Sequence, residues 1–131
     1  MSLFAEGMFS YLSTGGTDAG TRIYPNALPQ GVVLPAIRYT LVSDPPERTH
    51  SGPSQLHHPK YQLDCVMDGN EAYLNAHKLA NQIIALVDGY VGAMGDYTVH
   101  AGFKDERRDS FDSETGRYAV QVDLIFWHNT P

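Results

Sequence analysis

The sequence predicts an α+β domain: an antiparallel β-sheet of about four to five strands, two helices packed on one face, and a long projecting hairpin. Three observations lead to this fold class. Strand-like segments occur in pairs, helical segments stand apart from those pairs, and the loop within the first clear pair is long. Helices that do not alternate with strands are typical of antiparallel sheets covered on one side. The length of 131 residues fits a single domain, residues 1–131.

Five segments have the pattern of β-strands. In the clearest of them, Tyr61, Leu63 and Cys65 alternate with polar residues, which is the period of a half-buried strand. The last segment repeats this alternation after a turn at residues 113–116, and the first is short because Pro25 stops it. The predicted strands are residues 22–24, 36–43, 60–67, 97–111 and 117–128.

Two segments have helical periodicity. Apolar side chains fall on one stripe of residues 3–13, which predicts a short amphipathic helix. A longer helix is predicted over residues 70–88, where apolar residues recur at spacings of three and four. A capping-box pattern from Asp68 to Glu71 opens it, and Gly89 ends it with a positive φ.

The loop at residues 44–59 is the most unusual segment. It contains sixteen residues with four prolines and no helical period, although a turn of two to five residues is enough to join two such strands. Loops of this length in a small domain are usually functional or disordered. We therefore expect residues 44–59 to project from the domain and to make contacts with a partner.

Composition excludes several classes of protein. The net charge of −6 argues against wrapping nucleic acid, which requires a clustered basic face. No apolar run approaches the length of a membrane span, and the first residues lack the basic start of a signal peptide. A single cysteine cannot form an internal disulfide and suits a reducing compartment. We expect a soluble domain made in the cytoplasm.

Residues with catalytic or metal-binding chemistry are present but are not arranged as a site. The adjacent His57 and His58 lack the spacing of zinc ligands, and the other four histidines are dispersed. Cys65 lies on the apolar side of its strand, so we expect a buried structural thiol. The carboxylates from Asp105 to Glu114 alternate with basic residues, as in a solvated or subunit-facing hairpin. The sequence predicts no catalytic residue, no metal and no cofactor.

The order of several short segments resembles the phage tail completion family, also described as tail terminator or tail-to-head joining proteins, of long-tailed phages and gene-transfer particles. An N-terminal helix comes first, and the closing strand comes last. The matching segments between them are Arg22-Ile23-Tyr24-Pro25, Leu34-Pro35-Ala36-Ile37-Arg38-Tyr39, Tyr61-Gln62-Leu63-Asp64 before the helix at Glu71, and Asp109-Ser110-Phe111-Asp112-Ser113-Glu114-Thr115. The loop at 44–59, rich in proline and histidine, departs from the family pattern.

This resemblance implies a virion structural protein and not an enzyme. It implies one subunit of a hexameric ring that caps the tail tube and docks to the head-side connector or stopper protein. The expected location is the head–tail junction, or neck, after assembly in the bacterial cytoplasm. DNA is expected to pass through the ring without specific binding, and no membrane is involved.

Contacts with neighbouring subunits or partners are expected in the long loop, in the charged hairpin and on the second face of the last strand. The polar residues of the loop offer hydrogen bonds, and its prolines limit the freedom lost on docking. The candidate interface residues are Pro45, Pro46, Glu47, Arg48, His50, Leu56, His57, Arg107, Arg108, Phe111 and Trp127.

Two other functions remain open. A head-proximal connector or stopper protein belongs to the same broad class and differs in its place in the particle. A dimeric ligand-binding or small-enzyme domain belongs to a different class, and a pocket at the seam between subunits is typical of it. The predicted sheet offers few convergent polar groups for such a pocket.

Overall fold

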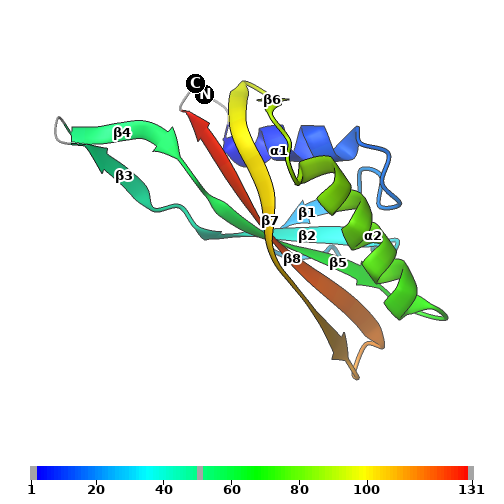
Figure 1. Ribbon diagram of the computed structural model, residues 1–131. Helices are drawn as coiled ribbons and strands as arrows, with labels where there is room; N and C mark the ends of the chain where they lie inside the picture. Colours follow the sequence, from blue (N-terminus) through cyan, green and yellow to red (C-terminus); the bar gives the residue numbers. More distant parts are fainter. Residues whose placement is uncertain (1–2, 50–51, 130–131) are drawn as a thin grey trace.

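The computed structural model describes residues 3–49 and 52–129, which form two helices and one eight-stranded sheet (Figure 1). The elements are α1 (Phe4–Ser13), β1 (Ile23–Pro25), β2 (Ala36–Ser43), β3 (Pro46–Thr49), β4 (Gly52–His57), β5 (Lys60–Met67), α2 (Ala72–Val87), β6 (Gly92–Met94), β7 (Tyr97–Asp112) and β8 (Arg117–Asn129). The predicted helices and strands are present, with ends that differ by one or two residues.

The last strand, β8, is the centre of the sheet. It pairs antiparallel with β5 on one side and with β7 on the other. Beyond β5 come β2 and β1, and β6 pairs with the start of β7. The prediction of four to five strands is therefore too low, and a purely antiparallel sheet is wrong. β1 runs parallel to β2, with Ile23 opposite Ile37, because residues 26–35 carry the chain back before β2 begins.

The loop at residues 44–59 contains two further strands. β3 and β4, which we call the arm, pair antiparallel with each other and extend away from the helices (Figure 1). The arm is joined to the body of the sheet by two register pairs between β4 and β8, Leu56 with Asn129 and His57 with His128. The expected irregular loop is wrong, although the projecting hairpin is present. Pro46 is the first residue of an edge strand, a position where proline is tolerated.

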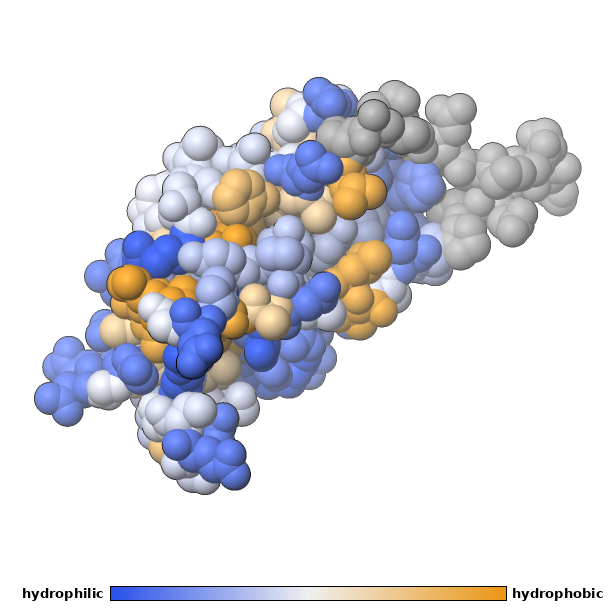
Figure 2. Space-filling view, turned by 180° about the vertical axis from the view of Figure 1, so that it is seen from behind, coloured by the Kyte–Doolittle hydropathy of each residue, from blue (hydrophilic) through white to orange (hydrophobic). Residues whose placement is uncertain are grey.

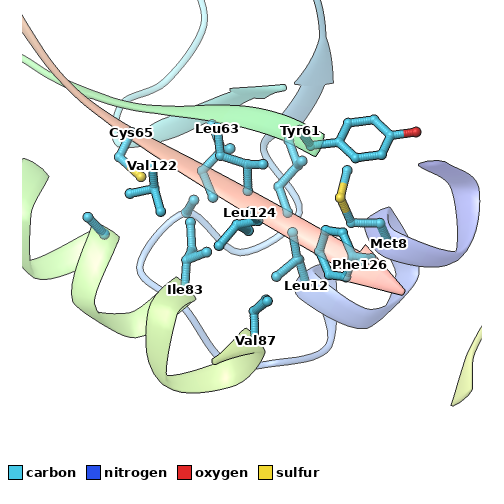
Figure 3. Packing of buried hydrophobic residues seen from close by; sticks show 14 of the residues in the cluster. Met8, Leu12, Tyr61, Leu63, Cys65, Ile83, Val87, Val122, Leu124 and Phe126 are labelled. Atoms are coloured by element: carbon cyan, nitrogen blue, oxygen red, sulfur yellow. The ribbon is translucent and has the colours of Figure 1, made fainter. Parts of the chain in front are cut away.

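Both helices pack on the same face of the sheet, and the core lies between them and β5 and β8 (Figure 3). Met8 and Leu12 of α1 and Ile83 of α2 are fully buried there, as their helical spacing predicts. The sheet contributes every second residue of its central strands to this core, namely Tyr61, Leu63, Cys65, Val120, Val122, Leu124 and Phe126. The opposite face of the sheet, which we call the open face, carries the residues between them, which are polar except for Ile125 near the end of β8.

The start of α2 differs from the prediction. The helix begins at Ala72, and Glu71 precedes it with a left-handed φ of 61° and no side-chain cap. The capping box expected from Asp68 is therefore wrong, because Glu71 is turned out of the helix. The predicted end is confirmed: Asp88 closes the helix and Gly89 follows with a φ of 83°.

A close contact fixes α1 against β6. A Cβ atom on Gly7 would lie 2.2 Å from the carbonyl oxygen of Met94, so only glycine permits this approach. The Tyr11 hydroxyl also donates to the carbonyl oxygen of Leu86 over 2.6 Å and joins α1 to α2. These contacts place the first turn of α1, including Phe4, beside the base of the arm. In the described part of the chain, neither helix has the length and hydrophobicity of a membrane span.

Candidate interaction surfaces

A network of paired charges lies on the open face. Arg38 on β2 donates to Asp64 on β5, with 2.9 Å between Nε and Oδ2, and Gln62 Nε2 donates to Oδ1 over 2.9 Å. The carboxylate of Asp64 is well covered, since the residue is only 2% exposed. Buried carboxylates are costly unless they are paired and hydrogen-bonded. This pair therefore holds β2 and β5 in register on the side that the helices do not cover.

Arg108 is the centre of the second half of this network. Its Nη1 donates to Asp123 over 2.9 Å, its Nε to Gln121 over 3.1 Å and its Nη2 to Gln62 over 2.9 Å. The hydrogen bond with Asp123 is the main reason that the pKa of Arg108 is raised. Lys60 lies 2.8 Å from Asp105 and 3.7 Å from Asp123. The cations described on this face are thus neutralised, and they form no continuous basic belt.

Apolar side chains form a strip beside this network. Phe103, Ile125 and Trp127 are neighbours on the open face of β7 and β8 and are half-buried. Trp127 stacks on His58, with 4.6 Å between ring centroids. Figure 2 shows one side of the molecule with hydrophobic side chains in small groups among hydrophilic ones. The surface seen there offers several small apolar contacts and no single large patch.

The far end of the β7–β8 hairpin carries exposed aromatic rings. Phe111 is 54% exposed and packs on Tyr118, with 4.6 Å between centroids, and Tyr118 lies edge-on to Tyr73 of α2. On the same side, His77 Nε2 lies 3.1 Å from Asp109, and Arg107 Nη2 donates to Asn81 over 2.5 Å. This end combines rings with acidic groups and is accessible to another protein.

A pocket of about 390 Å³ lies at the base of the arm, and we call it the arm-root pocket. Segments far apart in sequence build it, because α1, the end of β2, the start of β5 and the end of β8 meet there. Its lining is mainly aromatic and aliphatic, with one carboxylate and two imidazoles: Leu3, Phe4, Ala5, Pro25, Asn26, Tyr39, Leu41, Asp44, His57, Pro59, Tyr61, Tyr97 and His128.

The predicted interface residues fall into two groups. Pro45, Pro46, Glu47, Arg48, Leu56 and His57 belong to the arm or its base, and Trp127 lies nearby through its stack on His58, while Arg107, Arg108 and Phe111 lie on β7. His50 lies outside the described residues. Arg107 and Arg108 are hydrogen-bonded within the chain, which leaves Phe111 as the exposed residue of the second group.

Of the residues that line the arm-root pocket, only His57 was predicted as an interface residue. Tyr39, Tyr61 and Tyr97 lie on predicted strands and also line this pocket, which the strand pattern does not indicate. Their hydroxyl groups were the available signal, because tyrosine is common where one end of a ring is buried and the other meets a polar surface.

The histidines, cysteine and carboxylates form no recognisable chemical site in the described part of the chain. No group of three or more of these side chains is placed to hold a metal ion there. Cys65 is fully buried, as its place in the strand predicts, and burial raises the pKa of its thiol well above the usual range. A buried neutral thiol is a poor nucleophile, so Cys65 serves packing.

Solved structures of other proteins share this fold. One belongs to the virion of a native gene transfer agent particle, with a TM-score of 0.68 and 11% identity over 98% of this chain and 96% of that chain. A second has a TM-score of 0.61 and 13% identity over 100% and 98% of the two chains. No curated protein sequence matches the chain.

The family of the chain is shown by a sequence model, since structures of such low identity show only the fold. The model for tail completion protein gp17 matches residues 13–129, which includes α2 and all strands from β1 to β8. This span is nearly the whole chain, and it agrees with the resemblance found in the order of the sequence segments. The chain belongs to the tail completion protein gp17 family, a family of structural phage-tail proteins.

Proposed function

We propose that the protein is a tail terminator, one subunit of a hexameric ring that caps the tail tube and joins it to the head-side connector or stopper protein. The family assignment supports a structural role in the tail. The number six comes from the family resemblance. The proposed location is the head–tail junction of the virion, after assembly in the bacterial cytoplasm.

The observation that carries this proposal is a sheet with two open edges on opposite borders. From Asp105 to Asp112, β7 pairs with β8 on one side, and no strand of the described chain pairs with its other side. On the far border, β1 covers only three residues of β2, and no described strand pairs with the outer side of residues 40–43 or of β3. Open edges are sites where strands of another chain add to a sheet.

Open edges on opposite borders favour a ring over an isolated dimer. If one edge of each subunit pairs with the other edge of the next, the same contact repeats around a circle until it closes. A two-fold dimer pairs one edge with its own copy and leaves the second edge free. The arm extends β2 and β5 beyond the body, so it can reach a neighbouring subunit or the adjoining ring.

The charge pattern suits a passage for DNA. A basic lining binds phosphates and slows movement along the channel, whereas a balanced or acidic lining does not. On the open face, Arg38, Lys60 and Arg108 are each within hydrogen-bonding distance of a carboxylate. We propose that this face lines the passage without specific DNA binding and that the protein has no catalytic activity.

A connector or stopper protein one ring nearer the head is the second candidate, because the same open edges serve any ring. Gene order separates the two, since a major tail-tube gene immediately downstream favours the terminator. The dimeric ligand-binding alternative is weaker, because the chain belongs to a family of structural tail proteins. The arm-root pocket is the feature on which that alternative rests.

The ring is tested by cross-linking purified particles or tails and measuring the mass of the covalent product. We expect a ladder that ends at six copies. Free protein at the same concentration is the control, because a ring completed on a tail gains contacts that the free subunits lack. A ladder that ends at two copies in particles contradicts the proposal.

A further inference from the structure

The arm-root pocket has an aromatic floor and an exposed aliphatic rim. Phe4 and Tyr61 are buried at its base, while Leu3 is 69% exposed and Leu41 is 48% exposed at its edge. Large apolar side chains at the rim of a cavity are typical of a site that another molecule covers. The pocket therefore has the construction of a binding site for a side chain or a short segment.

The aromatic rings are arranged around this space at several angles. The centroids of Phe4 and Tyr97 are 5.3 Å apart with the rings edge to face, and those of Tyr39 and Tyr61 are 6.3 Å apart at 68°. Phe4, Tyr61 and Tyr97 are buried, so the half-buried Tyr39 offers the most accessible ring of this set. The faces of aromatic rings carry negative electrostatic potential. A cation placed over such a face therefore binds more tightly than a neutral group of the same shape.

Carboxylates add to this negative potential. Asp44 lies on the rim, and its charge adds to burial in raising the pKa of Tyr61 to about 12. Glu6, in the first turn of α1, adds to burial in raising the pKa of Tyr39. None of the described lining residues is lysine or arginine, and the basic group beside Asp44 is the His57 imidazole, with 3.9 Å between Nδ1 and Oδ1. His128 stays neutral more readily than an exposed histidine, because burial lowers its pKa.

We propose that the arm-root pocket receives an arginine side chain from an extended segment of another virion protein. The methylene groups of that side chain contact Leu3 and Leu41, and its guanidinium lies over the Tyr39 ring near Asp44. Arginine fits better than lysine because its planar cation stacks on aromatic rings. This inference does not rest on the proposed ring, since it concerns one subunit and one partner segment.

The occupant is another protein and not a second copy of this chain. The chain has a net charge of −6, and most of its basic side chains already have partners within the chain. Arg38, Lys60, Lys78 and Arg108 each lie within ion-pair distance of a carboxylate, and Arg107 donates to Asn81. A protein with free arginine side chains complements this acidic, aromatic pocket better.

The test uses capped arginine, N-acetyl-arginine methylamide, and its neutral analogue N-acetyl-citrulline methylamide. Both are titrated into the purified full-length protein, and NMR shifts of Tyr39, Tyr61 and Leu41 are followed. We expect the arginine probe to bind about fivefold more tightly than the citrulline probe, from the cation–π term. Equal binding of both probes, or no shift at the pocket, overturns the proposal.

Two variants and a control sharpen the result. Asp44→Asn should remove much of the preference for the arginine probe over the citrulline probe, whereas Leu41→Ala should weaken the binding of both probes equally. Asp68→Asn is the matched control, because Asp68 is also exposed and lies outside the pocket lining. Concentration-dependent self-association that Asp44→Asn abolishes would place a second copy in the pocket and overturn the choice of partner.

Discussion

Arg108 pairs with Asp123 diagonally across β7 and β8. In the register of the two strands, Asp123 stands opposite Glu106, and Arg108 stands opposite Gln121. An irregularity between Lys104 and Glu106 sets this register. A slip of one residue would turn every side chain of the strand to the other face. The irregularity therefore places Arg108 in the open-face network and Arg107 on the side of α2. The register of β7 and the charge balance of the open face therefore depend on each other.

Replacing Arg108 with alanine should lower the free energy of unfolding by about 1–2 kcal/mol. Asp123 is 3% exposed, so losing its main partner leaves a poorly compensated carboxylate. The loss is smaller than for a fully buried pair because the Arg108 side chain is 39% exposed. Chemical denaturation measures it.

The control for this change is Arg117→Ala, which should change stability by no more than about 0.5 kcal/mol, as for ordinary surface sites. The double variant Arg108→Ala with Asp123→Asn should lose less than the sum of the two single losses, because the residues interact directly. Additive losses would show that the pair contributes no coupling.

The main strands and the long helix were predictable because their signals are local. Leu63 and Cys65 alternate with polar residues, and this alternation alone places β5 with one face in the core. The helical spacing of Leu79 and Ile83 likewise identifies the buried face of α2. The end of α2 was predictable because Gly89 readily adopts the positive φ that ends a helix.

The arm and the charge network were not predictable in the same way. Pro46 and Pro53 weaken any strand signal in the arm, which forms because its two strands pair with each other. Arg108 meets Gln62 although 46 residues separate them, and no local pattern reveals such a contact. The approach of Gly7 to Met94 also depends on tertiary packing, since a glycine inside a helix predicts only a weaker helix.

Replacing Gly7 with alanine should destabilise the protein by about 2–3 kcal/mol. In an exposed helix the same change stabilises by roughly 0.5–1 kcal/mol, because alanine is the better helix former. Here the new Cβ meets the Met94 carbonyl oxygen at 2.2 Å, so α1 must move away from β6. Ser10→Ala on the exposed face of α1 is the control and should be nearly neutral. A stabilised Gly7→Ala protein would contradict this packing.

The free energy of unfolding should decrease as the pH falls below about 6.5, the usual pKa of histidine. Burial is the main reason that the pKa of His128 is lowered, and His57 and His100 add to this, while Asn129 and Asp44 oppose it. Since the unfolded chain binds the proton more readily, His128 contributes stability above its unfolded pKa and loses it as the pH falls.

His128→Phe tests this pH dependence, because phenylalanine keeps a ring against Phe4, 4.3 Å away, and cannot take up a proton. Denaturation at pH 7.5 and at pH 5.5 should show a smaller decrease for the variant than for the native protein. Equal decreases would assign the effect to the other histidines.

Removing the arm should leave a folded subunit that cannot complete particles. The cut replaces residues 46–55 with an Asn-Gly turn and keeps Leu56 and His57, which pair with β8. Pro59 also stays, because its carbonyl oxygen accepts the Phe126 N–H over 3.1 Å. Loop entropy changes slowly with length, so the free energy of unfolding should change by no more than about 1 kcal/mol. Particle assembly should instead yield headless or over-long tails.

A second variant separates the length of the arm from its sequence. Ten residues of glycine and serine in place of residues 46–55 keep the connection but remove the arm strands and their prolines. If the arm binds a neighbouring subunit or the adjoining ring, this variant should fail in assembly as completely as the short turn does. Melting curves and particle yields are measured for both variants beside the native protein. Normal yields of infectious particles from either variant would show that the arm is only a tolerated extension of the sheet.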